Sequence, residues 1–223
     1  MSLPSLSAVS TLAEAGQGRL ARLPEQYQHL GHRLVGRRTS PLVWDAWAAE
    51  GLRSVPVSER ELAFFASHAA YHRAGTAVDA GCGTGGLSRR LRDFGYRVTG
   101  LDTSVVSLDL ARAHGHGLGL TYQQHDLEAG PPPGMPAGGC DLVAARLLLP
   151  FLTDPEAWLH EVRGRWLRPG GCLYLGVAFG DAGALVRGQL PREAIARLCA
   201  GWEFRARRDL GLLTCLILRS PMR

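Results

Sequence analysis

The stretch VDAGCGTGG, residues 78–86, decides the fold of this chain. It follows a short apolar run and precedes a segment of helical periodicity, which is the context expected of a nucleotide-binding loop. After Gly81 and Gly83, Gly86 completes the pattern G-x-G-x-x-G, which is typical of dinucleotide-binding loops. Gly85 instead completes the shorter pattern G-x-G-x-G. The glycines therefore predict a loop whose backbone a ligand can approach closely, but they do not identify the ligand.

Apolar runs and helical periods alternate outward from this loop. Two closing runs, 202–210 and 212–220, are read as strands and are separated only by Gly211, so they must pair as an antiparallel hairpin. The alternation itself predicts a parallel sheet with helices on both faces. The predicted fold class is α/β, a Rossmann-like doubly wound sheet that is mostly parallel and ends in an antiparallel C-terminal hairpin. We expect strands at 76–81, 96–102, 120–126, 140–145 and 171–178, and helices at 58–75, 85–95, 104–117, 154–167 and 191–201.

The N-terminal quarter of the chain has a different pattern. Residues 24–53 are aromatic and basic, and they predict two short helices broken at Pro41. We therefore divide the chain into an N-terminal tail and helical lid segment, residues 1–55, and one compact domain, residues 56–223. A chain of 223 residues is long enough for this arrangement but short for a full second domain.

Two side-chain patterns flank this boundary. Trp44 and Trp47, with Tyr27 upstream, form an apolar stripe that is either part of the core or an aromatic lid over a ligand. On the other side, Ser58 is followed three positions later by Glu61, which is the pattern of a capping box at a helix start.

Composition excludes several classes of protein. The chain contains no apolar run of about 18 residues, and its N-terminus lacks the basic start and apolar core of a secretory signal. We therefore expect a cytoplasmic protein without a membrane partner. The cysteines are scattered and contain no C-x-x-C pattern, which predicts free, mostly buried thiols, no disulfide framework and no metal site. They are Cys82, Cys140, Cys172, Cys199 and Cys215.

The net charge of +5 is weak support for a nucleic-acid partner. Every basic residue is arginine and lysine is absent, which is the coding bias of a G+C-rich genome. A nucleic-acid surface should be a localised cluster instead of a high total. The best candidate cluster lies in the lid segment, and it is either a solvated surface or a surface for an anionic substrate. It consists of His29, His32, Arg33, Arg37 and Arg38.

Three aspartates favour a ligand that carries a ribose, an ammonium group and an adenine over one that carries a pyrophosphate. Asp102 ends the second expected strand, where a carboxylate can accept hydrogen bonds from ribose hydroxyls. Asp79 lies inside an otherwise apolar strand, and a buried carboxylate needs a partner. An ammonium group would be a suitable partner, whereas a pyrophosphate would be repelled. Asp126 ends the third strand, where it can accept the amino group of adenine.

With these motifs in order, the chain resembles the class I S-adenosylmethionine-dependent methyltransferases over residues 58–220. The resemblance rests on five segments: VDAGCGTG, GLDTS, QHDLE, CDLVAARLLL and WLRPGGCLYL. It implies S-adenosylmethionine as cofactor and S-adenosylhomocysteine as product. It also implies that the cofactor contacts Asp79, Gly81, Cys82, Gly83, Gly85, Asp102, Thr103, Asp126, Leu127 and Ala145.

The segment after the fourth strand departs from the family. Many members that act on small molecules carry a histidine or an aromatic residue there, whereas this chain has Arg146 followed by three leucines. No general base can therefore be assigned, which in-line methyl transfer driven by positioning tolerates. Arg146 is a weak catalytic candidate that would orient an anionic or carbonyl group, or it is a salt-bridged structural arginine. Tyr27 and Trp44 are candidates for a lid or substrate contact.

The resemblance predicts a methyltransferase of small-molecule acceptors, in keeping with a tailoring step in specialised metabolism. One alternative is an RNA or peptide methyltransferase that uses the arginine-rich N-terminal face. Another is a methyltransferase-like protein that binds the cofactor without methyl transfer, such as a cyclase. A nicotinamide oxidoreductase is disfavoured by Asp79 and the closing hairpin. We expect a monomer or a homodimer and no nucleic-acid partner.

Overall fold

The structure is a computed structural model of the chain. Tyr27 and the basic cluster from His29 to Arg38 lie outside the residues that it describes. The described residues are 40–51, 55–69, 75–136, 138–180, 188–211 and 213–221.

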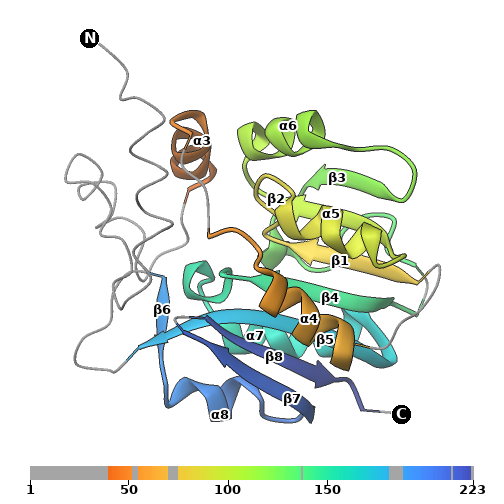
Figure 1. Cartoon of the computed structure of the whole chain (residues 1–223), viewed down its shortest axis with the longest axis vertical. Helices are drawn as coiled ribbons and strands as arrows, with labels where there is room; N and C mark the ends of the chain where they lie inside the picture. Colours follow the sequence, from red (N-terminus) through yellow and green to blue (C-terminus); the bar gives the residue numbers. More distant parts are fainter. Residues whose placement is uncertain are drawn as a thin grey trace.

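One mixed sheet runs through the described part of the chain (Figure 1). Its strands follow the order β3-β2-β1-β4-β5-β8-β7, and β6 pairs with β5 outside this path. The first five strands are mutually parallel, whereas β8 is antiparallel to both β5 and β7. The predicted fold class and the antiparallel hairpin are therefore confirmed. The strands are β1 (Thr76–Ala80), β2 (Arg97–Asp102), β3 (Leu120–Gln124), β4 (Cys140–Arg146), β5 (Leu167–Gly180), β6 (Gln189–Pro191), β7 (Glu203–Leu210) and β8 (Leu213–Arg219).

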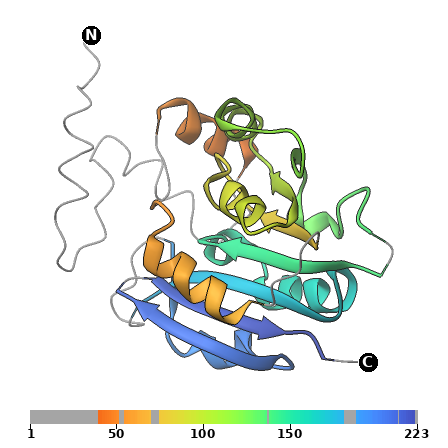
Figure 2. The same ribbon diagram turned by 45° about the vertical axis from the view of Figure 1, so that its right-hand side comes forward.

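Helices cover both faces of the sheet (Figure 2). Helices α4, α5 and α6 pack against one face, and α7, η3 and α8 pack against the other. Helix α3 belongs to neither layer and contacts α6 at one end of the molecule. The helices are α3 (Pro41–Ala49), α4 (Glu59–His68), α5 (Gly86–Asp93), α6 (Val105–His114), α7 (Pro155–Glu161) and α8 (Ala194–Leu198), with short turns η1 (Leu127–Ala129), η2 (Leu149–Phe151) and η3 (Val162–Trp166).

The core follows from the alternation of side chains along each strand. Val143 and Leu173 pack on the face covered by α7, while their neighbours Leu142 and Tyr174 pack on the opposite face. All four are fully buried. A central strand with apolar residues at consecutive positions therefore requires helices on both sides, as the sequence predicted.

Several boundaries differ from the expected ones. Strand β5 begins at Leu167 instead of residue 171, because Leu167 already pairs with Cys140 before a register shift in the ladder. The helix expected over 154–167 ends as α7 at Glu161 and continues as a π-helical turn. Strand β6 was not expected, and it forms because residues 189–191 pair with the end of β5.

The expected capping box at α4 is half right. The Ser58 hydroxyl accepts the Glu61 amide at 3.2 Å, as an N-cap should. The Glu61 carboxylate, however, does not return to the helix start. It is buried with 1% exposure and bonds instead to Arg146 and to the Tyr174 hydroxyl. Hydrogen bonds to a charged guanidinium and a hydroxyl in the core are stronger than one hydrogen bond to the Ser58 backbone amide near the surface, so the carboxylate turns inward.

Candidate functional site

A cavity of about 610 Å³ lies at the carboxyl ends of the parallel strands, where ligands bind in doubly wound sheets. One half is polar and is formed by the loops after β1, β2 and β3. The other half is apolar and is formed by α3, by the segment after β4 and by the ends of the hairpin strands. The polar half includes Gly81, Cys82, Gly83, Asp102, Thr103 and Asp126. The apolar half includes Trp44, Leu148, Phe151, Leu152, Leu210 and Leu213.

The loop between β1 and α5 requires glycine at three positions. Gly81, Gly83 and Gly85 have φ angles of 69°, 52° and 75°, a region that side chains with a Cβ rarely adopt. A Cβ on Gly83 would meet no atom within 4 Å, so this residue faces open space. Gly85 instead lies against the Tyr122 hydroxyl and does not line the cavity. Gly86 is the first residue of α5, so the shorter glycine pattern describes the loop.

Asp102 ends β2 and is held in place by the backbone on both sides. Its Oδ2 accepts the Gly83 amide at 2.8 Å, and its Oδ1 accepts the Ser104 amide at 2.9 Å. Burial raises the pKa of Asp102, and these two amide hydrogen bonds act in the opposite direction. Because each carboxylate oxygen can accept a second hydrogen bond, the group can still receive two hydroxyls from the cavity.

Asp79 and Ala145 lie behind the cavity wall and not in it. Asp79 is 1% exposed and accepts a 2.5 Å hydrogen bond from the Ser88 hydroxyl. Burial raises the pKa of Asp79 from 3.8 to about 7, although the Ser88 hydrogen bond and the charge of Arg146 lower it. Asp79 is therefore poised to be ionised or protonated near neutral pH, depending on what approaches from the cavity.

The third strand supplies the end of the polar half. Asp126 begins η1, where its Oδ1 accepts the Glu128 amide at 3.1 Å, and Leu127 follows it in the wall. The ring of His125 bonds to the Gly130 carbonyl at 2.8 Å and faces Trp166. A carboxylate next to an apolar residue is a suitable pair for an adenine ring and its amino group.

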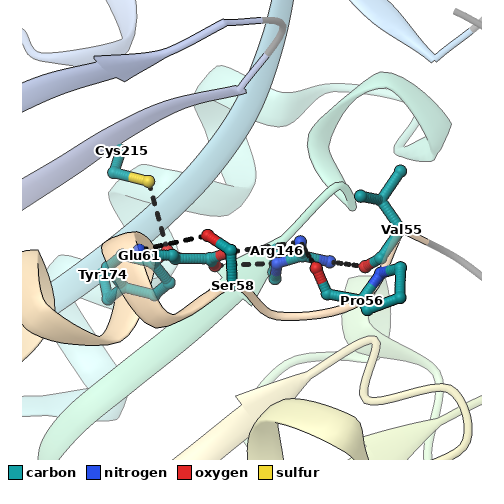
Figure 3. A network of polar contacts seen from close by, with 7 residues as sticks. All are labelled: Val55, Pro56, Ser58, Glu61, Arg146, Tyr174 and Cys215. Carbon is teal, nitrogen blue, oxygen red and sulfur yellow. Dashed lines mark hydrogen bonds and ion pairs between the residues drawn. The ribbon is translucent and has the colours of Figure 1, made fainter. Parts of the chain in front are cut away.

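Arg146 ends β4, and its guanidinium is turned away into a buried network (Figure 3). Its Nε donates to Glu61 at 2.7 Å, and its terminal nitrogens donate to Glu61 and to two backbone carbonyls. These carbonyls belong to Val55, at 2.7 Å, and Pro56, at 3.2 Å. The side chain is 8% exposed. The structure therefore shows the ion pair of the structural interpretation, whereas the catalytic role of Arg146, which also lines the cavity, stays a prediction.

Helix α3 forms the roof of the apolar half. Trp44 makes an edge contact with Phe151 from η2, with ring centroids 4.9 Å apart, and Trp47 lies 6.1 Å from Trp44. Both tryptophans line the cavity. The two tryptophans of the aromatic stripe therefore face the cavity. The wall of this half also includes Leu147, which has a positive φ of 56°.

Sequence reasoning missed the residues that close the apolar half. Phe151 lies in a run of apolar residues after β4, and Leu210 and Leu213 flank the hairpin turn. No spacing rule marks them, because they reach the cavity only through strand pairing and a short 3₁₀ turn. The sequence also contains no sign that Asp45, on α3, bonds to Ser104 and Val106 at the start of α6, because these two residues are 59 and 61 positions from Asp45 in the chain.

The sequence of this chain is similar to those of known methyltransferases. A family model described as a methyltransferase domain matches residues 78–175. Malonyl-(acyl-carrier protein) O-methyltransferase of Serratia marcescens is 34% identical over 164 residues, which cover 66% of this chain and 59% of that protein. The chain belongs to the class I S-adenosylmethionine-dependent methyltransferases. A second relative, the ubiquinone biosynthesis O-methyltransferase of Marinobacter nauticus, is 32% identical over 44% of this chain and 42% of that protein. The chain thus spans less than two thirds of the length of these relatives.

Two solved structures share the fold of this chain. An S-adenosylmethionine dependent methyltransferase from Mesorhizobium loti aligns with a TM-score of 0.58 at 20% identity, covering 73% of this chain and 98% of that chain. The cyclase SpnF aligns with a TM-score of 0.62 at 19% identity, covering 74% of this chain and 81% of that chain. At this identity the likenesses show the architecture alone.

The cavity fits the cofactor of this methyltransferase family, S-adenosylmethionine. Gly83 leaves room for a ligand, Asp102 has acceptor positions left for a ribose, and Asp126 with Leu127 suits adenine. Within the described ranges, no group of three or more acidic, histidine or cysteine side chains could hold a metal ion. All five cysteines are free, and four of them are buried, as predicted. No helix in the described part of the chain is long and apolar enough to cross a membrane.

Proposed function

We propose that this protein transfers the methyl group of S-adenosylmethionine to a small-molecule acceptor. The observation that carries this proposal is the division of one cavity into a polar half at the strand ends and an apolar half under α3. The polar half suits the nucleoside, and the apolar half suits an acceptor. Both named relatives are O-methyltransferases, so we propose an oxygen atom as the acceptor.

Specific residues would hold the cofactor. Asp102 would accept the ribose hydroxyls, while Asp126 and the Leu127 amide would bind adenine. Gly81 and Gly83, with Cys82 and Thr103, would line the methionine and ribose portions. Asp79 would act on the amino group through a water molecule, because its carboxylate lies behind the wall. The cofactor supplies an electrophilic methyl group when bound, and the chain positions it.

The reaction we propose is an in-line displacement in which positioning contributes most of the rate. The acceptor would lie in the apolar half of the cavity beside the Trp44–Phe151 contact, on the side of Leu147 and Leu148. Ala145 would support this end from behind the wall. Residues 1–55 would form the tail and lid segment, and residues 56–223 the methyltransferase domain. We also propose a cytoplasmic location.

Two measurements test the proposal. Calorimetric titration with S-adenosylhomocysteine should show binding to the wild type, and Asp102→Ala should weaken it by about tenfold to a hundredfold, the value of charged hydrogen bonds. Incubation with labelled S-adenosylmethionine and a panel of carboxylates and phenols should then label a small molecule. Binding of the cofactor product without any methyl transfer would favour a cofactor-binding protein such as a cyclase, since SpnF has this fold.

An RNA or peptide acceptor remains the second candidate because the lid segment contains the basic cluster from His29 to Arg38. Binding to phosphates depends strongly on salt, because bound counterions are released. Retention on heparin and on tRNA that disappears at modest salt would support this candidate. A small-molecule enzyme should instead elute without such retention.

A further inference from the structure

Helix α3 is bound to the start of α6 by the carboxylate of Asp45. The Oδ1 of Asp45 accepts the Ser104 hydroxyl at 2.6 Å and the Val106 amide at 3.2 Å. Ser104 is the N-cap of α6 and is fully buried, and its hydroxyl also accepts the Ser107 amide at 3.0 Å. The acid of one helix thus caps the start of another, where a negative charge is stabilised.

The same serine is bonded to the ribose acid. The Ser104 amide donates to Oδ1 of Asp102, and the Gly83 amide donates to Oδ2 of Asp102. A continuous chain of hydrogen bonds therefore runs from Asp45 on the lid through Ser104 and Asp102 to the glycine loop. A ligand that fixes the position of Asp102 would therefore also fix Ser104, whose hydroxyl binds Asp45 on α3.

The apolar contacts of α3 come from one side of the helix. Ala48 is buried and Trp44 and Trp47 are half-buried, while Leu42 is 75% exposed. Trp44 contacts Phe151 across the cavity, and the chain after α3 is bound through the Val55 and Pro56 carbonyls. The helix therefore bridges the α6 side and the η2 side of the cavity, and the hydrogen bonds that Asp45 accepts attach it to the start of α6.

We propose that Asp45 is a positioning residue that couples docking of α3 to occupation of the ribose subsite through Ser104 and Asp102. The proposal rests on the assignment of Asp102 to the ribose of the cofactor. Coupling between two sites is reciprocal, so the docked helix strengthens cofactor binding and the bound cofactor holds the helix. Trp44 reports on this state because it lies on α3 and contacts Phe151 only when the helix is docked.

The test compares three variants in calorimetric titrations with S-adenosylhomocysteine. Asp45→Ala should weaken binding by about fivefold to tenfold, a usual size for coupling between sites. Asp45→Asn keeps the Oδ1 acceptor and should recover most of the affinity. Glu50→Ala removes a carboxylate from the exposed end of the same helix, so it is the matched control and should bind like the wild type.

Tryptophan fluorescence distinguishes a loss of α3 docking from a general loss of stability. The wild type should change its tryptophan fluorescence on binding S-adenosylhomocysteine, and Trp44→Phe should remove that change. In Asp45→Ala the change should be lost although thermal unfolding is close to that of the control. Wild-type affinity together with a wild-type fluorescence change in Asp45→Ala would overturn the coupling and leave the proposed function intact. A wild type that does not bind S-adenosylhomocysteine would overturn both.

Discussion

The guanidinium of Arg146 donates to the Glu61 carboxylate at 2.7 Å, although 85 positions separate the two residues in the chain. This ion pair joins the end of β4 to α4 and is almost completely buried. The Tyr174 hydroxyl donates to the same carboxylate at 2.6 Å, and burial and the Glu61 charge raise the pKa of Tyr174. Figure 3 shows that the network also reaches the backbone at Val55, the last residue of the lid segment, and at Pro56, the first residue of the domain.

We expect Arg146→Ala to destabilise the fold by about 3–5 kcal/mol, because it leaves the buried charge of Glu61 without its partner. Arg90→Ala is the matched control, since it breaks an exposed pair of another α4 acid, Glu59, and should cost less than about 1 kcal/mol. Urea unfolding followed by circular dichroism measures both. Equal losses in the two variants would mean that the buried pair contributes no more than a surface pair.

Asp79→Asn should make the protein more stable at pH 8 than the wild type, but much less so at pH 4. The folded-state pKa of Asp79 is about 7 and its ordinary value is 3.8, so the folded wild type binds a proton that the unfolded chain releases between these values. The contribution of Asp79 to the free energy of unfolding therefore falls as pH rises from 3.8 to about 7, and asparagine removes this loss. Urea unfolding at several pH values measures the difference, and a constant difference would contradict it.

The affinity for S-adenosylhomocysteine should fall as the pH is lowered through 7. A protonated Asp79, with its pKa of about 7 in the folded protein, has no charge to attract the ammonium group of the ligand. The expected loss approaches about tenfold per pH unit, the limit for one linked proton. Calorimetry between pH 5.5 and 8.5, in buffers of differing ionisation enthalpy, measures the slope and the proton uptake. The same slope in Asp79→Asn would assign the effect to another group.

Two glycine substitutions should separate binding from stability. Gly83→Ala places a Cβ in open space in the cavity, so it should weaken S-adenosylhomocysteine binding by about tenfold or more and cost about 1–2 kcal/mol for its positive φ. Gly85→Ala has a similar φ but drives its Cβ into the Tyr122 hydroxyl, which adds about 1–3 kcal/mol. Thermal unfolding and calorimetry on both variants check the order. If Gly83→Ala lost more stability than Gly85→Ala, the assignment of Gly83 to the open cavity and of Gly85 to the packed core would be wrong.

Much of the fold and of the polar half of the cavity could be predicted from local pattern. Asp102 and Asp126 both line the cavity because parallel strands all end at one edge, so residues at or just after the strand ends converge, and their roles toward a ligand stay predictions. The role of Asp79 stays a prediction, and the structure adds that its carboxylate lies behind the wall. Glu61 shows the opposite case, because its spacing from Ser58 predicted a helix cap while its carboxylate lies in the core.

The sequence by itself determined the sheet, its antiparallel closing hairpin and the glycine loop, because periodicity and short connections act between near neighbours in the chain. Only the tertiary structure decided that Arg146 binds Glu61, that Asp45 caps α6 through Ser104, and that Phe151 meets Trp44. These contacts join segments far apart in the sequence, and no local spacing encodes them. They depend on where the packed sheet places each segment, and they shape the half of the cavity that would select the acceptor.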